Sequence, residues 1–155
     1  GEPLRDGDCI LAAGVSIRVL ATPGHTSDSM CFRLPHDEPE TVITGDTVLG
    51  RGSTMIDHPD GSLGDYLRSL ELLGQRSGAT VLPAHGAPLP DLQEVCEELT
   101  EHRLERLDQV REIVAGLGRD ASVEAITDAV YADVPAGVRR AAERSIAAQL
   151  AYLGY

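Results

Sequence analysis

The sequence lacks the features of membrane-spanning, exported and broadly nucleic-acid-binding proteins. Its 155 residues hold no apolar run near the roughly 18 residues that a membrane-spanning helix needs, and the polar start GEPLRDGD predicts neither a signal peptide nor a transit peptide. Basic residues are few, with 13 against 25 acidic ones. The net charge of −12 argues against broad electrostatic binding to nucleic acid or to anionic membranes.

Paired cysteines and lysine are missing too. The first absence bears on the cellular compartment, and the second bears on the source organism. The three cysteines, Cys9, Cys31 and Cys96, are odd in number, widely separated and without CxxC spacing. This pattern predicts ordinary thiols in a reducing, cytoplasmic environment. Every basic residue is arginine, while alanine and glycine are abundant, which favours a GC-rich bacterial genome as the source.

What is present is a β-rich pattern over the first part of the chain. CILAAGVSIRVLAT predicts a hairpin that turns at Ala13-Gly14, and SMCFRL, TVITGD and ATVLP predict three further strands. A helix is expected over 63–73, where leucines recur at helical spacing behind Ser62 as the N-cap. These elements predict a unit over residues 1–90 that consists of a sheet with one covering helix.

The second part of the chain, residues 91–155, has helical periodicity throughout. A long helix is predicted first, and SVEAITDAVYA and GVRRAAERSIAAQLAYL predict two shorter ones behind it. In the last of these, Val138, Ala142, Ile146 and Leu150 follow one another at steps of four. They share one helix face, so we expect all four to be buried against the long helix.

Three motifs share one arrangement, in which an apolar strand ends and a metal-capable residue follows. His25 comes after IRVLATPG, Asp46 after TVITG, and His85, followed by Gly86, after TVLPA. Loops at strand ends gather at one edge of a sheet, so side chains far apart in the chain can converge there, and glycine lets the backbone turn sharply beside them. Two imidazoles and a carboxylate suit zinc or a similar divalent metal. Taken alone, His25 is more often a turn residue, Asp46 could cap a turn and His85 could form a local hydrogen bond, so only the recurrence favours a metal site.

TPGHTSDS, TGDTVLG and LPAHG together resemble the third, fourth and fifth metal-site motifs of the metallo-β-lactamase-fold hydrolases. The resemblance implies a mixed α/β fold, namely the C-terminal half of an αββα sandwich followed by a helical, winged-helix-like tail. It also implies that His25 binds one metal ion, that His85 binds a second, and that Asp46 bridges both. Thr26 and Ser29 match positions that would hold the His25 loop in place.

The defining HxHxDH motif of that family is absent, and no two histidines of this chain have HxH spacing. In the family this motif lies in the N-terminal half and supplies most of the metal ligands. We therefore expect a partner half carrying HxHxDH to complete the site. Without it the chain should be inactive, should bind zinc poorly, and should expose apolar surface or form a homodimer to hide it. His58, in IDHPDG, is interpreted either as a substrate-cleft residue or as a plain loop residue.

The tail extends the resemblance to the branch typified by the mitochondrial β-lactamase-like endoribonuclease. The implied reaction is hydrolysis at a site with two zinc ions. That branch favours a phosphodiester in single-stranded RNA, whereas the net charge of −12 favours a thioester or other small ester, as in glyoxalase II. A third hypothesis makes the tail a winged-helix nucleic-acid-binding module with Arg139, Arg140 and Arg144 on its recognition helix. A fourth is a degenerate domain that holds no metal.

Overall fold

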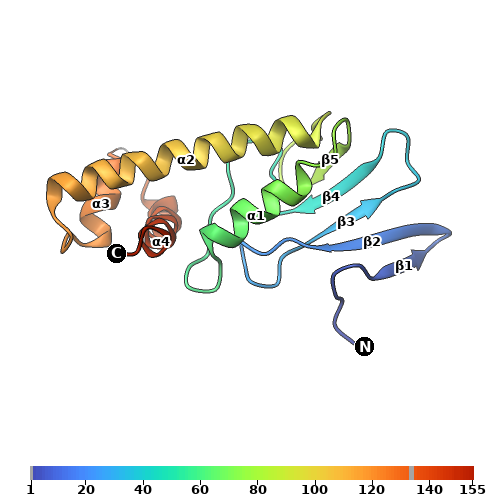
Figure 1. Ribbon diagram of the computed structural model, residues 1–155, viewed down its shortest axis with the longest axis horizontal. Helices are drawn as coiled ribbons and strands as arrows, with labels where there is room; N and C mark the ends of the chain where they lie inside the picture. Colours follow the sequence, from blue (N-terminus) through green and yellow to red (C-terminus); the bar gives the residue numbers. More distant parts are fainter. Residues whose placement is uncertain (1, 133–134) are drawn as a thin grey trace.

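The computed structural model describes residues 2–132 and 135–155, which form a sheet, a helical layer and a helical tail (Figure 1). The described residues contain one sheet of five strands in the order β1-β2-β3-β4-β5. The strands are β1 (Cys9–Ala12), β2 (Val15–Ala21), β3 (Met30–Leu34), β4 (Thr41–Gly45) and β5 (Thr80–Pro83). The helices are α1 (Leu63–Leu73), α2 (Leu92–Leu117), α3 (Val123–Val130) and α4 (Ala136–Leu153). The predicted mixed α/β class is confirmed.

The directions of the strands bring three strand ends to one edge of the sheet. From β1 to β4 each strand pairs antiparallel with the next, and β5 joins β4 in parallel. β2, β4 and β5 therefore run in the same direction. The loops that follow them, which carry His25, Asp46 and His85, leave from the same edge, so the predicted placement of these loops is confirmed.

Local sequence signals account for where several elements begin and turn. Ala13 (φ 50°) and Gly14 (φ 81°) both lie in the left-handed region, as the tight turns that match the twist of a hairpin require. Ser62 precedes α1 and accepts a hydrogen bond from the backbone N–H of Asp65, and Asp91 accepts two such bonds at the start of α2. These caps satisfy backbone groups that would otherwise lack partners. The predicted hairpin and the predicted Ser62 cap are both confirmed.

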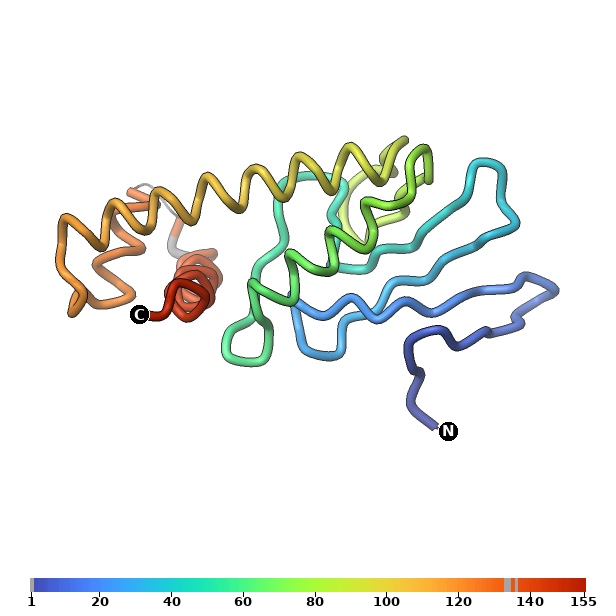
Figure 2. The backbone as a smooth tube through the Cα atoms, in the orientation of Figure 1, coloured from blue at the N-terminus to red at the C-terminus, as the bar shows by residue number. Residues whose placement is uncertain are grey.

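One face of the sheet packs against α1 and α2 (Figure 2). Apolar side chains from the strands and from both helices form one buried cluster, to which α2 contributes its first turns and a residue nearer its middle. Its members include Leu20, Cys31, Val42, Val81, Leu63, Tyr66, Leu70, Leu73, Leu92, Cys96 and Leu107. The predicted boundary between two units at residue 90 falls just before α2, and the start of α2 belongs to the same buried cluster as the sheet. The division into two units stays a prediction.

The other face of the sheet carries a row of apolar side chains across four strands. The register aligns Val19 with Phe32, Phe32 with Ile43, and Ile43 with Leu82. Val19 at the β2 end of the row is fully buried, whereas Ile43 is 37% exposed and Leu82 is 36% exposed. An apolar row of this kind on the second face is typical of a sheet that is covered on both sides.

The tail is helical in the residues that the structure describes, and it packs around the far half of α2 (Figure 1). Val110 and Val114 of α2 form a second buried cluster with Ile126 of α3 and Ile146 of α4. Within 2–132 and 135–155, no helix is both long enough and apolar enough to cross a bilayer.

The prediction of a single buried face on α4 is only partly right. Ile146 is fully buried, and Ala142 and Leu150 are half-buried. Val138 is 53% exposed, so its predicted burial is wrong. It lies in the first turn of α4, and periodicity predicts which face of a helix is apolar without predicting how far a neighbouring element covers that face.

Candidate metal site

Asp46 and His85 come together from the ends of two adjacent parallel strands. β4 ends at Gly45, whose carbonyl accepts a hydrogen bond from the backbone N–H of Ala84 just after β5. The carboxylate oxygen Oδ1 of Asp46 then lies 3.5 Å from Nε2 of His85. Both side chains reach solvent, with 41% of Asp46 and 77% of His85 exposed. A carboxylate and an imidazole are thus presented side by side at the sheet edge.

The loops that carry these two residues are locked together by direct backbone contact. The N–H of Gly50 donates to the carbonyl of His85 at 2.8 Å. Gly86 has φ 95°, and a Cβ placed on it would lie 2.8 Å from Cα of Gly50, so glycine is required there. A cavity of about 360 Å³ lies beside His85, and its lining residues are Gly50, Arg51, His85, Gly86 and Ala87.

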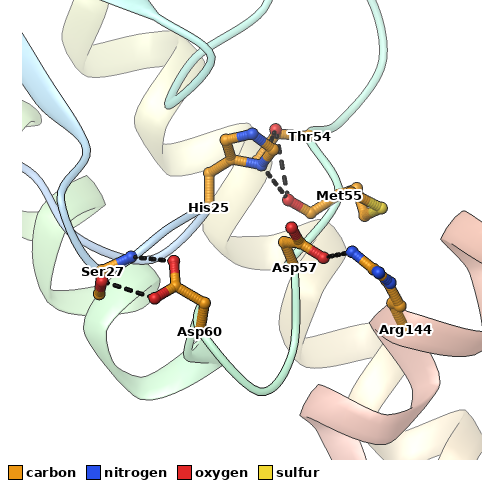
Figure 3. A network of polar contacts seen from close by, with 7 residues as sticks. All are labelled: His25, Ser27, Thr54, Met55, Asp57, Asp60 and Arg144. Atoms are coloured by element: carbon orange, nitrogen blue, oxygen red, sulfur yellow. Dashed lines mark hydrogen bonds and ion pairs between the residues drawn. The ribbon is translucent and has the colours of Figure 1, made fainter.

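His25 is oriented by a backbone carbonyl. Its Nδ1 lies 2.6 Å from the carbonyl oxygen of Met55, and the hydroxyl of Thr54 is 3.4 Å from the same nitrogen (Figure 3). A carbonyl oxygen can only accept, so Nδ1 carries the proton and donates it. Nε2 then keeps its lone pair, which is the state that a metal-binding imidazole needs.

The turn that follows His25 is closed by its own polar side chains. Ser29 Oγ accepts a hydrogen bond from the backbone N–H of Thr26 at 3.1 Å, and the two hydroxyls lie 2.8 Å apart. Gly24, on the other side of His25, has φ 147° and packs directly on α1, because a Cβ there would lie 2.4 Å from Cα of Tyr66. This is the geometry that the predicted supporting role of Thr26 and Ser29 requires, and the role itself stays a prediction.

A buried set of hydroxyl and thiol groups ties the His25 loop to the Asp46 loop. Thr22, just after β2, lies 3.2 Å from Thr47, the residue that follows Asp46, through their hydroxyl oxygens. The Thr22 hydroxyl is also 3.2 Å from the thiol of Cys31. Burial raises the pKa of the Cys31 thiol, so this group stays protonated and has a structural role rather than that of a metal ligand.

The structure brings together some of the predicted site residues and not others. Within the described ranges, no three His, Cys, Asp or Glu side chains are close enough to hold one metal ion. Asp46 and His85 form a pair, and His25 belongs to a separate contact with Met55. His58 is half-buried in the loop before α1 and is not among the residues that line the cavity beside His85. The donor types fit zinc, and this chain presents them as an Asp46–His85 pair and a separate imidazole, that of His25.

Several residues around His25 were missed by sequence reasoning. The carboxylate of Asp57 pairs with Arg144 of α4, and the carbonyl of Thr54 accepts a hydrogen bond from Arg103 of α2. The partners are 87 and 49 residues apart in the chain, and no motif links them. Nearby, Asp60 accepts hydrogen bonds from the backbone and hydroxyl of Ser27, which lower the pKa of its carboxyl.

Comparisons with known sequences agree on one family. The family model described as the metallo-beta-lactamase superfamily matches residues 1–85. The atrochrysone carboxyl ACP thioesterase of Aspergillus chevalieri is 32% identical over 150 residues, which cover 91% of this chain and 46% of that protein. The beta-lactamase-like protein 2 homolog of Caenorhabditis elegans is 33% identical over 141 residues, or 91% of this chain and 45% of that protein. The chain thus spans less than half the length of these two relatives.

Comparisons with solved structures extend the match to the tail. A metallo-beta-lactamase family protein from Thermus thermophilus aligns with a TM-score of 0.83 at 28% identity, covering 98% of this chain and 48% of its own. A beta-lactamase domain protein from Burkholderia ambifaria aligns with a TM-score of 0.84 at 25% identity, covering 99% and 46%. These structures are bacterial while the curated relatives are fungal and nematode proteins, so a bacterial source stays a prediction. The fold, the metal-site motifs and the family match lead to one conclusion: this chain belongs to the metallo-beta-lactamase superfamily.

Proposed function

We propose that this chain supplies part of the dinuclear metal site of a metal-dependent hydrolase, with His25, Asp46 and His85 as its ligands. One observation carries the proposal: these residues follow three strands that run in the same direction, and Asp46 and His85 lie 3.5 Å apart where two of those strands end. Two bound zinc ions would polarise the scissile group and make a hydroxide available at neutral pH.

Each ligand has a separate part in this proposal. Asp46 has two carboxylate oxygens, so it can contact two ions at once, and its place beside His85 suits that role. His25 offers Nε2 because Nδ1 is engaged with Met55. The remaining ligands come from a polypeptide that carries HxHxDH, which is the partner we propose for this chain. By itself the chain is expected to be inactive.

We further propose an acyl thioester as the substrate class. The thioesterase relative is similar over 91% of this chain, so the similarity includes part of the tail. The net charge of −12 disfavours a polyanionic substrate such as RNA. An RNA phosphodiester, which the endoribonuclease branch favours, is the alternative outcome of the test.

The positions of two of the three tail arginines, Arg139 and Arg144, favour a structural role over nucleic-acid binding. Arg139 forms ion pairs with Asp128 at 2.7 Å and with Glu143 at 3.0 Å. Arg144 is paired with Asp57. Binding to phosphates would require these two arginines to give up their ion pairs with carboxylates. We therefore do not propose a nucleic-acid-binding module.

The test is a hydrolysis assay on the chain mixed with an HxHxDH polypeptide and zinc. The substrates are an acyl-glutathione thioester and a fluorescent single-stranded RNA. We expect thioester turnover that Asp46→Asn lowers by at least about 100-fold, as expected for loss of a group that holds the metals. The matched control Asp37→Asn, in the exposed β3–β4 loop, should leave turnover unchanged. Cleavage of the RNA without hydrolysis of the thioester would show that the substrate is a phosphodiester. Metal binding without turnover of either substrate would contradict the proposed hydrolase activity.

A further inference from the structure

The loop over residues 54–57, between β4 and α1, holds His25 at two points. Its Met55 carbonyl accepts the Nδ1 proton of the imidazole, at 2.6 Å. Its Asp57 backbone N–H donates to the carbonyl of His25, at 3.0 Å. The position of this loop therefore determines both the tautomer of the imidazole and the direction in which Nε2 points.

The 54–57 loop is itself held by two arginines from the helices behind it. Arg103 of α2 is only 5% exposed and donates from its guanidinium to the carbonyl of Thr54. The same guanidinium lies over the ring of Tyr66, 5.1 Å from its centroid. Arg144 of α4 reaches across to the carboxylate of Asp57, as Figure 3 shows. Both ends of the loop are thus fixed by cations that belong to the helical part of the chain.

The two contacts differ in what they do for the fold. Arg103 is a buried cation whose removal would leave a cavity and an unpaired carbonyl, so it serves packing as well as position. The Arg144–Asp57 pair is partly exposed, with 38% and 29% of the side chains open to solvent. Pairs of that kind contribute little to stability. We therefore attribute to the Arg144–Asp57 pair a role in holding the 54–57 loop in position rather than in stabilising the fold.

We propose that Arg144, acting through Asp57 and the 54–57 loop, is a positioning residue for His25, so that the helical tail is a working part of the metal site. The idea rests on the proposed function, in which His25 is a metal ligand. Arginine suits the task because it stays charged at all physiological pH values and presents a planar set of donors. Without the pair, the loop loosens, the Met55 carbonyl no longer fixes Nδ1–H, and Nε2 loses its fixed direction.

The first experiment reads the tautomer of His25 in the full 155-residue chain, without metal. Long-range ¹H–¹⁵N correlation spectra at a pH of about 8, where an ordinary imidazole is neutral, distinguish Nδ1–H from Nε2–H. We expect the Nδ1–H form in the native chain and a mixture of both forms in Arg144→Gln. The control Arg140→Gln removes the same charge from an exposed position of α4 and should keep the Nδ1–H form. Arg144→Lys should restore it in part.

A second pair of variants approaches the same contact from the loop. Asp57→Asn removes the ion pair while keeping the size of the side chain, and it should give the same mixture of tautomers as Arg144→Gln. The double variant should give no larger change, because both substitutions remove one interaction. Melting temperatures should stay within about 4 °C of native in every variant, as expected for a pair worth little to stability. A pure Nδ1–H form in both folded single variants would overturn the proposal.

Zinc affinity of the chain mixed with an HxHxDH polypeptide separates this proposal from the proposed function. We expect Arg144→Gln to weaken zinc binding about 10-fold, at the lower end of the range for outer contacts of a metal site. A tautomer shift in Arg144→Gln with no zinc binding in any mixture would support positioning and contradict the metal site. Normal zinc binding in the native mixture, with an unshifted tautomer in Arg144→Gln, would contradict positioning alone.

Discussion

The two faces of the sheet are built by the same strands and differ in their cover. On β4 and β5, Val42 and Val81 are fully buried beneath α1 and α2, while the next residues, Ile43 and Leu82, are 37% and 36% exposed. A strand with one solvent face normally alternates apolar with polar residues. Here both faces are apolar, so this sheet has the composition of the inner layer of a sandwich.

This comparison explains why the proposed metal ligands lie where they do. The loops after β2, β4 and β5 leave the sheet at the end where these strands finish, between the covered face and the open face. A second layer on the open face would bring its own loops to that edge. We propose that the second layer comes from the HxHxDH polypeptide, or from a second copy of this chain when that polypeptide is absent.

The largest expected effect concerns the close contact between the His25 loop and the covering helix. Gly24→Ala should lower the free energy of unfolding by about 3 kcal/mol or more, because the new Cβ would lie 2.4 Å from Cα of Tyr66 and cannot be accommodated without backbone movement. Urea denaturation measures the loss. The control Gly78→Ala has a φ of 72°, near the left-handed region, with nothing within 4 Å, and should cost only about 1 to 2 kcal/mol. Equal losses would mean that the contact does not constrain the loop.

The next prediction compares one leucine from each face. Leu70→Ala, beneath the sheet and 1% exposed, should cost about 2 to 5 kcal/mol because it leaves a cavity in a packed core. Leu82→Ala, which is 36% exposed, should cost about 1 kcal/mol or less because solvent already reaches the side chain. Chemical denaturation of both variants tests this. A Leu82→Ala loss as large as that of Leu70→Ala would show that the second face is already covered.

The covered face should also make the protein sensitive to alkali. Burial raises the pKa of Tyr66 to about 12 from an ordinary value of 10.0, and that of Cys96 to about 12 from 9.0. Both groups are kept neutral by the fold, so their stabilising effect is complete below pH 9 and is lost as the pH rises towards 12. The slope should approach about 1.4 kcal/mol per pH unit for each group. Cys96→Ala should lower the slope between pH 9 and 10 without abolishing it, because burial also raises the pKa of the Cys31 thiol. An unchanged slope would contradict the assignment to Cys96.

The smallest effect on stability, and the clearest on association, should come from the open face. Ile43→Thr with Leu82→Thr should change the free energy of unfolding by about 1 kcal/mol or less, since both positions are partly solvated. The same change should abolish self-association of the chain, which sedimentation velocity detects. The surface control Leu104→Thr, on α2 and 48% exposed, should leave association unchanged. A native chain that stays monomeric at high concentration would contradict the predicted homodimer.

Much of the fold could be predicted because its signals are local. The hairpin at Ala13-Gly14 and the cap at Ser62 depend on residues within a few positions of one another, and short apolar segments bounded by turn residues indicate the strands. The placement of the three metal-site loops follows from strand order, since β2, β4 and β5 run in one direction. The exposed Val138 shows the limit of periodicity, which does not report where a covering element ends.

The organisation around His25 could not be predicted, because its contacts join distant parts of the chain through common residue types. Met55 acts through its backbone carbonyl, so its side chain carries no signal of that role. Arg103 and Arg144 look like ordinary surface arginines of charged helices, and only the folded structure places them against Thr54 and Asp57.

The most direct test of the central claim is a calorimetric titration of zinc. The claim is that His25, Asp46 and His85 are one part of a two-metal site that another polypeptide completes. We expect weak or undetectable binding to the chain alone, and two tightly bound ions once an HxHxDH polypeptide is added, with His85→Ala lowering the number to one. Tight binding of two ions by the chain alone would contradict the claim.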